Sequence, residues 1–139
     1  MREVFGNFPL PSHNWAAAAA RRGICIAQQD QEAFWRFHDL LLSTQSAITS
    51  ESLATITAQF AASDRRLDSA KYEECMAGNH PDSRLNADLA AGRLLDIHSS
   101  PVVFLNGRRY EGFPDEAALS NAIKLAVGES AEPAKEIDK

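Results

Sequence analysis

The sequence from His98 to Tyr110, HSSPVVFLNGRRY, has the pattern of a β-hairpin. Val102 to Leu105 is a short apolar run of β-branched and aromatic side chains, which is typical of a buried strand. Asn106-Gly107 tolerates the positive φ angles that a type I′ turn requires. Pro101 donates no backbone N–H, so it belongs at the start of the first strand. The pattern therefore predicts that Val102 to Leu105 turns back into a second strand over 108–113.

Most of the chain before this hairpin has helical patterns. Glu3 to Leu10 has the composition of an opening strand, which Pro9 and Pro11 would end. Asn14 and Ser50 are good helix N-caps. Apolar spacing predicts five helices before the hairpin and one after it, over about 14–29, 30–42, 51–61, 69–77, 82–95 and 116–127. This order of elements favours a mixed α/β sandwich with a large helical insertion.

Length and composition restrict the class of protein. A chain of 139 residues with 45% apolar residues is long enough for one domain with a core of its own. The net charge of −5 argues against nucleic acid as a partner. We expect no membrane span, because no apolar run approaches the required length. We also expect no signal peptide, because the chain opens directly in strand-like sequence.

Four segments, in this order and spacing, resemble the DsbA-like thiol–disulfide oxidoreductases. They are FGNFPLP at 5–11, EAFWRFHDLL at 32–41, ADLAAGRLLDI at 87–97 and SPVVFLNG at 100–107. The resemblance covers about residues 3–127. It implies an α/β fold, in which a thioredoxin-like sheet carries an inserted helical domain. We therefore expect one domain over 1–127, with the helical insertion at about 14–95, and a flexible tail over 128–139.

The resemblance also implies a site at the start of the hairpin. Pro101 would be the cis-proline that lies against the active-site dithiol. Ser100 would be the residue whose backbone meets the bound substrate. Members of the family more often have Gly-Thr-Pro where this chain has Ser99-Ser100-Pro101. The alternative is an ordinary trans proline at a strand entrance.

The reactive motif of that family, Cys-x-x-Cys at the start of a helix, is absent from this sequence. The two cysteines are Cys25 and Cys75, so we expect no catalytic residue in this chain. The first strand and the catalytic helix would lie upstream of Met1, in a longer gene. Without that strand the sheet would have an open edge, through which two copies could pair as a homo-oligomer.

The two cysteines both fall within the predicted helical insertion. Because some relatives carry a second, non-catalytic disulfide there, the resemblance implies a structural Cys25–Cys75 bridge. The alternative is two separate buried thiols. The four histidines have no metal-ligand spacing, so we expect no metal and no cofactor. His38 has the setting of a hydrogen-bonded core histidine, and His98 lies near the expected substrate site.

Three functions fit these patterns. The first is a truncated member of the DsbA-like family in the cell envelope or periplasm, with protein thiols and disulfides as substrates and no redox activity of its own. The second is a non-catalytic binding or assembly module on the same scaffold. The third is a kappa-type glutathione-dependent isomerase or transferase. That class needs a thiol-activating serine, for which Ser12 is the candidate.

Overall fold

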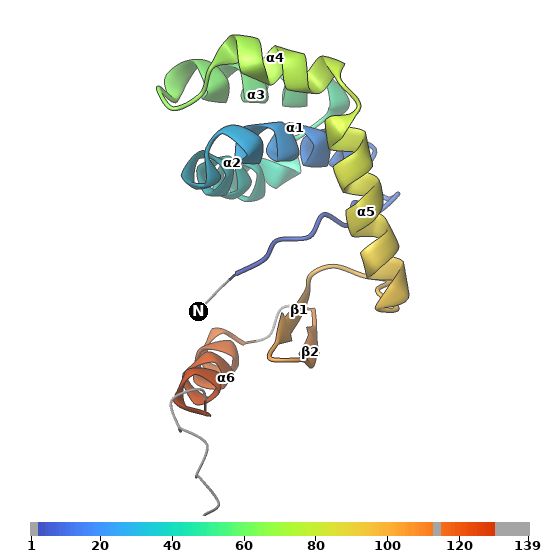
Figure 1. Ribbon diagram of the computed structural model, residues 1–139, viewed down its shortest axis with the longest axis vertical. Helices are drawn as coiled ribbons and strands as arrows, with labels where there is room; N and C mark the ends of the chain where they lie inside the picture. The colour runs from blue at the N-terminus through green and yellow to red at the C-terminus, as the bar shows by residue number, and fades with distance from the viewer. Residues whose placement is uncertain (1–2, 113–114, 130–139) are drawn as a thin grey trace, which may run out of the picture. The chain divides into compact units, whose positions relative to one another are not determined.

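The computed structural model describes residues 3–112 and 115–129 (Figure 1). The elements are α1 (Ala16–Gln29), α2 (Gln31–Thr44), the 3₁₀ helix η1 (Gln45–Ala47), α3 (Ser50–Ser63), α4 (Ser69–Ala77), α5 (His80–Leu94), β1 (Val102–Leu105), β2 (Arg108–Glu111) and α6 (Glu116–Glu129). They fall into two compact units. A helical unit spans Gly6–Asp96, and a hairpin unit comprises Met1–Phe5 and Ile97–Lys139. The described residues of the hairpin unit are 3–5, 97–112 and 115–129.

Helix α1 is the centre of the helical unit, because it contacts α2, α3, α4 and α5. Figure 1 shows α3 and α4 on one side of α1 and α2, with α5 following from the end of α4. Small residues on α1 let its neighbours approach closely, and a Cβ on Gly23 would lie 3.3 Å from the ring of Phe34. The largest core cluster contains Cys25, Ile26, Ala33, Phe34, Phe37 and Tyr72.

Side-chain caps explain where several helices begin. Asp30 accepts a hydrogen bond from the Ala33 N–H at 2.7 Å at the start of α2. Thr49 and Ser52 form a reciprocal capping box on α3, so the N-cap is Thr49 and not the predicted Ser50. Asp68 accepts from two N–H groups of α4. These caps satisfy N–H groups that have no partner within the helix.

The predicted strand over Glu3 to Leu10 is wrong, because these residues take part in no β-ladder among the described residues. The predicted helix start at Asn14 is also wrong. The His13 N–H donates to the Leu10 carbonyl at 3.1 Å, and the Ala16 N–H donates to the His13 carbonyl at 3.0 Å. Successive turns therefore occupy this segment, and α1 begins only after them.

Part of the same segment packs on α5 within the helical unit. The side chain of Asp88 accepts hydrogen bonds from the backbone N–H of Asn7 at 3.0 Å and from its Nδ2 at 2.7 Å. One turn further along α5, Gly92 leaves room for the ring of Phe8. Asn7 is thus held by hydrogen bonds to Asp88, and the ring of Phe8 packs against Gly92. Neither residue is held by strand pairing.

In the hairpin unit, β1 and β2 pair antiparallel, with Val102 opposite Glu111 and Leu105 opposite Arg108. Asn106 and Gly107 have φ angles of 48° and 82°, so the predicted turn is confirmed. The second strand ends at Glu111, before the predicted end at 113, which lies outside the described residues. Helix α6 includes Gly128 and Glu129, so the predicted tail from 128 begins too early; the rest of it, 130–139, lies outside the described residues.

Candidate functional site

The loop before β1 presents Ser99 and Ser100 to solvent. The peptide bond between Ser100 and Pro101 is cis. The carbonyl of Pro101 accepts a hydrogen bond from the Gly112 N–H at 2.9 Å. Gly112 has a φ of 73°, a conformation that glycine adopts without steric cost. This bond fixes the end of the loop to the far end of the hairpin and leaves Ser100 accessible.

The hairpin beside this loop carries an aromatic and cationic surface. The ring of Phe104 on β1 is 41% exposed. The guanidinium of Arg109 lies 6.0 Å from the centre of that ring, and Nη2 of Arg109 lies 2.6 Å from Oε1 of Glu111. The guanidinium of Arg108 lies 5.2 Å from the centre of the Tyr110 ring. These groups can contact a peptide by stacking and hydrogen bonding.

The two cysteines lie in the helical unit and form a disulfide between α1 and α4. Cys25 is fully buried in the main core cluster, and Cys75 is partly buried at its border. The chain has no free cysteine. A nucleophilic thiolate is therefore not available from this chain while the bridge is intact.

Of the other residues singled out in the sequence, His98 lies in the same segment as Ser99 and Ser100, whereas Ser12 and His38 belong to the helical unit. Nδ1 of His38 lies 3.0 Å from Oδ1 of Asp39, on the half-buried side of α2. Ser12 is exposed in the turn before α1, and His98 is exposed in the segment after α5. Within residues 3–112 and 115–129, the structure contains no group of three or more His, Cys, Asp or Glu side chains able to hold a metal ion.

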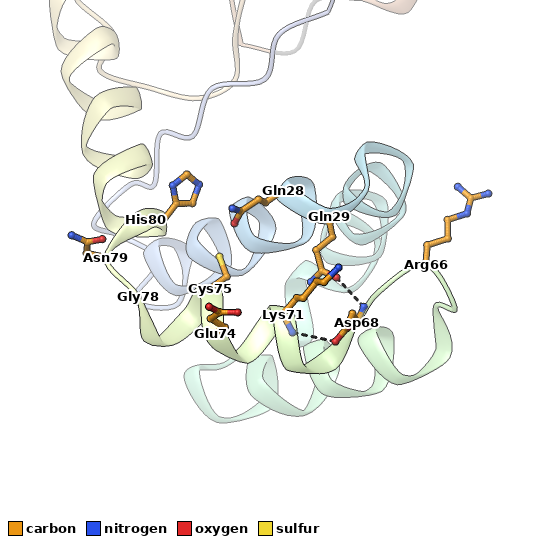
Figure 2. Close-up of a pocket in the computed structure, with 10 residues that line it drawn as sticks. All are labelled: Gln28, Gln29, Arg66, Asp68, Lys71, Glu74, Cys75, Gly78, Asn79 and His80. Atoms are coloured by element: carbon orange, nitrogen blue, oxygen red, sulfur yellow. Dashed lines mark hydrogen bonds between the residues drawn. The ribbon is translucent and has the colours of Figure 1, made fainter.

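A hollow of about 600 Å³ lies within the helical unit (Figure 2). Its lining comes from the end of α1, the segment before α4, α4 itself and the start of α5: Gln28, Gln29, Arg66, Asp68, Lys71, Glu74, Cys75, Gly78, Asn79 and His80. Oε1 of Gln29 accepts from the Asp68 N–H at 2.8 Å, whereas its buried Nε2 has no hydrogen-bond partner. No motif in the sequence indicates this hollow, because packing alone brings these segments together.

Ion pairs hold the segment between α3 and α4, which borders the hollow. Arg66 donates to the carboxylate of Glu32, and this hydrogen bond raises the pKa of Arg66 above its usual value. Arg36 donates to Asp64 through Nε at 3.1 Å and also through Nη2. The Arg36 hydrogen bonds lower the pKa of the Asp64 carboxyl. The segment between α3 and α4 is thus tied to α2 by two arginine–carboxylate pairs.

The elements and the loop define a mostly helical, α/β thioredoxin-like domain with a small two-stranded sheet. A family profile described as "Thioredoxin" matches residues 1–125. The chain therefore belongs to the thioredoxin family. No solved structure matches it at a significant level.

Curated relatives include three bacterial proteins named as Na⁺/H⁺ antiporters. They are NhaA 3 of Salinispora tropica, NhaA 1 of Salinispora arenicola and NhaA of Nitrosospira multiformis, each 32% identical to this chain. The alignments cover 91%, 91% and 92% of this chain, but only 18%, 18% and 20% of the respective relatives. The chain thus spans about a fifth of their length. Among the described residues, no helix is long and apolar enough to cross a membrane.

Proposed function

We propose that this chain is a DsbA-like domain that binds protein thiols and disulfides but does not catalyse their exchange with its own residues. The observation that carries this proposal is that the chain has no cysteine outside a disulfide. Both cysteines of the chain are joined in one disulfide, at a sequence separation of 50. Catalytic dithiols in thioredoxin-like domains need two close cysteines with one thiolate exposed. The binding surface of the proposal is the Ser100–Pro101 loop with the ring of Phe104.

An insulin-reduction assay tests the catalytic half of this proposal. With dithiothreitol as reductant, we expect the chain to leave the rate of insulin precipitation at the uncatalysed background. The Cys25→Ala/Cys75→Ala variant is the matched control, because it carries no sulfur pair at all. Turnover by the parent chain above that control would overturn the proposal.

The binding half is tested separately with an unfolded, alkylated protein, which offers extended peptide but no reactive thiol. We expect the loop and the exposed ring to bind it, and Phe104→Ala to weaken that binding. Truncating an aromatic contact residue costs about 2 kcal/mol or more at a binding hot spot, which corresponds to roughly thirtyfold in Kd. Leu125→Ala is the control, because Leu125 is 67% exposed on α6 outside the proposed surface. Equal affinity of the parent and Phe104→Ala chains would contradict this role of the hairpin.

We propose an oxidising compartment, the cell envelope, as the place where the chain works. The Cys25–Cys75 disulfide supports this, because such bridges persist outside the reducing cytosol. Acid quenching of cells followed by alkylation tests the proposal. We expect both cysteines to be protected from the alkylating reagent, and alkylation of both in unstressed cells would contradict it.

A second proposal concerns the polypeptide in which the domain operates. We propose that the domain acts as part of, or together with, a Na⁺/H⁺ antiporter. Three relatives with that name align with nearly the whole of this chain. The DNA on both sides of the coding region provides the test. We expect an antiporter gene to be continuous with it or directly adjacent. A chromosomal neighbourhood without such a gene would overturn this proposal and leave the first one standing.

A further inference from the structure

The two halves of the disulfide differ in burial. Cys25 has an exposed fraction of 0% and belongs to the central core cluster. Cys75 is partly buried and contributes to the lining of the hollow, whereas Cys25 does not (Figure 2). An incoming thiolate must contact the sulfur that it attacks, and access helps to decide which sulfur reacts. The hollow therefore makes Cys75 the accessible half of the bridge.

The groups around Cys75 suit a small zwitterionic ligand. Lys71 brings an ammonium group and Glu74 a carboxylate, and both are on α4 with Cys75. Gln29 also lines the hollow, and its buried Nε2 is a donor without a hydrogen-bond partner. A peptide-like thiol carries matching groups: an ammonium, carboxylates and amides.

We propose that the hollow admits a small peptide thiol of the glutathione class, which exchanges with the disulfide at Cys75. In this step the ligand thiolate attacks Sγ of Cys75, and a new S–S bond forms there. The bond between the two protein sulfurs breaks, and Sγ of Cys25 leaves as a thiolate that takes up a proton. The exchange has no net oxidation or reduction, and attack by Cys25 on the mixed disulfide restores the bridge. The proposal is independent of the proposed function, because it concerns a stoichiometric modification and not turnover of protein substrates.

The site of attack is tested on the full oxidised chain with reduced glutathione. After acid quenching and alkylation, mass spectrometry of the peptides shows which cysteine carries each group. We expect the glutathionyl group on Cys75 and the alkyl group on Cys25. A glutathionyl group mainly on Cys25, or no adduct when excess glutathione reduces the disulfide of a reference protein, would overturn the proposal.

Single-cysteine variants separate access from stability. Cys25→Ser leaves Cys75 as the one thiol, and Cys75→Ser leaves Cys25, so both variants lack the bridge. We expect Cys75 to react with oxidised glutathione at least about tenfold faster, since Cys25 is fully buried and thiol–disulfide exchange depends on access to the sulfur. In urea we expect both thiols to react equally fast, because both variants are then unfolded. That result would assign the native difference to the folded chain. Equal rates under native conditions would contradict the proposal, provided that circular dichroism shows both variants folded.

The contribution of the hollow is tested by charge reversal. Lys71→Glu is expected to slow the reaction with glutathione roughly fivefold, while the reaction with uncharged β-mercaptoethanol stays the same. Lys124→Glu on α6 is the matched control, because it makes the same charge change on an exposed residue outside the hollow. An equal loss with both thiols, or an equal effect of Lys124→Glu, would show that the hollow does not recognise the peptide thiol.

Discussion

At Gly92, helix α5 depends on the absence of a side chain. A Cβ at this position would lie 2.6 Å from Cδ2 of Phe8, which is closer than van der Waals contact allows. In an unobstructed helix, replacing glycine by alanine is favourable by about 1 kcal/mol. We expect Gly92→Ala to lower the free energy of unfolding by about 1–3 kcal/mol instead, measured by urea denaturation, because the ring must leave its position.

Two variants show whether the ring causes this loss. Gly128→Ala is the matched control, since a Cβ there has no heavy atom within 4 Å. We expect that variant to be at least as stable as the parent chain. In a Phe8→Ala background, Gly92→Ala is expected to cost nothing. A loss that persists in that background would show that Phe8 is not the obstacle.

Asp64 gives the stability of the chain a defined pH dependence. The Arg36 hydrogen bonds hold the pKa of this carboxyl below its usual value of 3.8 in the folded chain. A carboxylate whose pKa falls on folding stabilises the folded state above the unfolded-state pKa, and this contribution is lost as the pH falls below about 4. We expect Asp64→Asn to flatten the decline in urea stability between about pH 5 and pH 3.

The neighbouring charges provide the comparison for that profile. Arg36→Gln removes the main donor and is expected to flatten the profile as Asp64→Asn does. Asp39→Asn is the control, because the Asp39 side chain is 78% exposed and pairs with the adjacent His38. A parent-like acid profile in Asp64→Asn would contradict the assignment of this effect to the Arg36–Asp64 pair.

At the scale of elements, α4 depends on its bridge to α1. This helix spans Ser69–Ala77 and has one buried side chain, that of Tyr72. A disulfide that closes a loop with a separation of 50 residues stabilises a fold by about 4 kcal/mol in the chain-entropy model. We expect reduction with a phosphine to lower the free energy of unfolding by about that amount.

The Cys25→Ala/Cys75→Ala variant checks this value without a reductant in the solution. Reduction alters no side-chain carbon, whereas the variant also removes sulfur atoms from the core, so the variant is expected to be somewhat less stable than the reduced chain. Amide exchange of α4 is expected to speed up most. An unfolding free energy that does not change on reduction would show that packing alone holds α4.

Local chemistry explains which elements were predictable from the sequence. The fourth helix and the hairpin turn were predicted at their observed positions, because Asp68, Gly78 and Asn106-Gly107 act on their own neighbours. The sequence favoured a strand over 3–10 that the described residues do not form, because a strand exists only when another strand pairs with it. Over the part of the chain that the structure describes, the predicted sheet accordingly consists of β1 and β2 alone.

The loop before β1 and the hollow beside Cys75 also differ in whether the sequence predicts them. The position of Ser100-Pro101 directly before β1 was predictable, since proline lacks the N–H that a strand interior requires. It gave no signal for the hollow beside Cys75. Gln29 and Lys71 belong to helices far apart in the sequence, and their approach depends on how α1 packs against α4.

For the whole molecule, the distribution of buried residues predicts unequal stability of the two units. The buried residues of the described chain all lie in Gly6–Asp96, as do both core clusters and the disulfide. Among its described residues, the hairpin unit has a two-stranded sheet and one helix without a buried side chain. Such a hairpin is marginal in water without further packing.

We therefore expect a fragment of residues 6–96 to fold cooperatively on its own, with the disulfide formed and with urea stability close to that of the full chain. Hydrogen exchange of the full chain is the measurement that needs no fragment. Amides of α1 and α2 are expected to exchange only through global unfolding, and those of β1, β2 and α6 much faster, because local opening there exposes little apolar surface. Equal protection in both units would show that the hairpin unit unfolds together with the helical core, and would contradict a separate contribution of Gly6–Asp96 to stability.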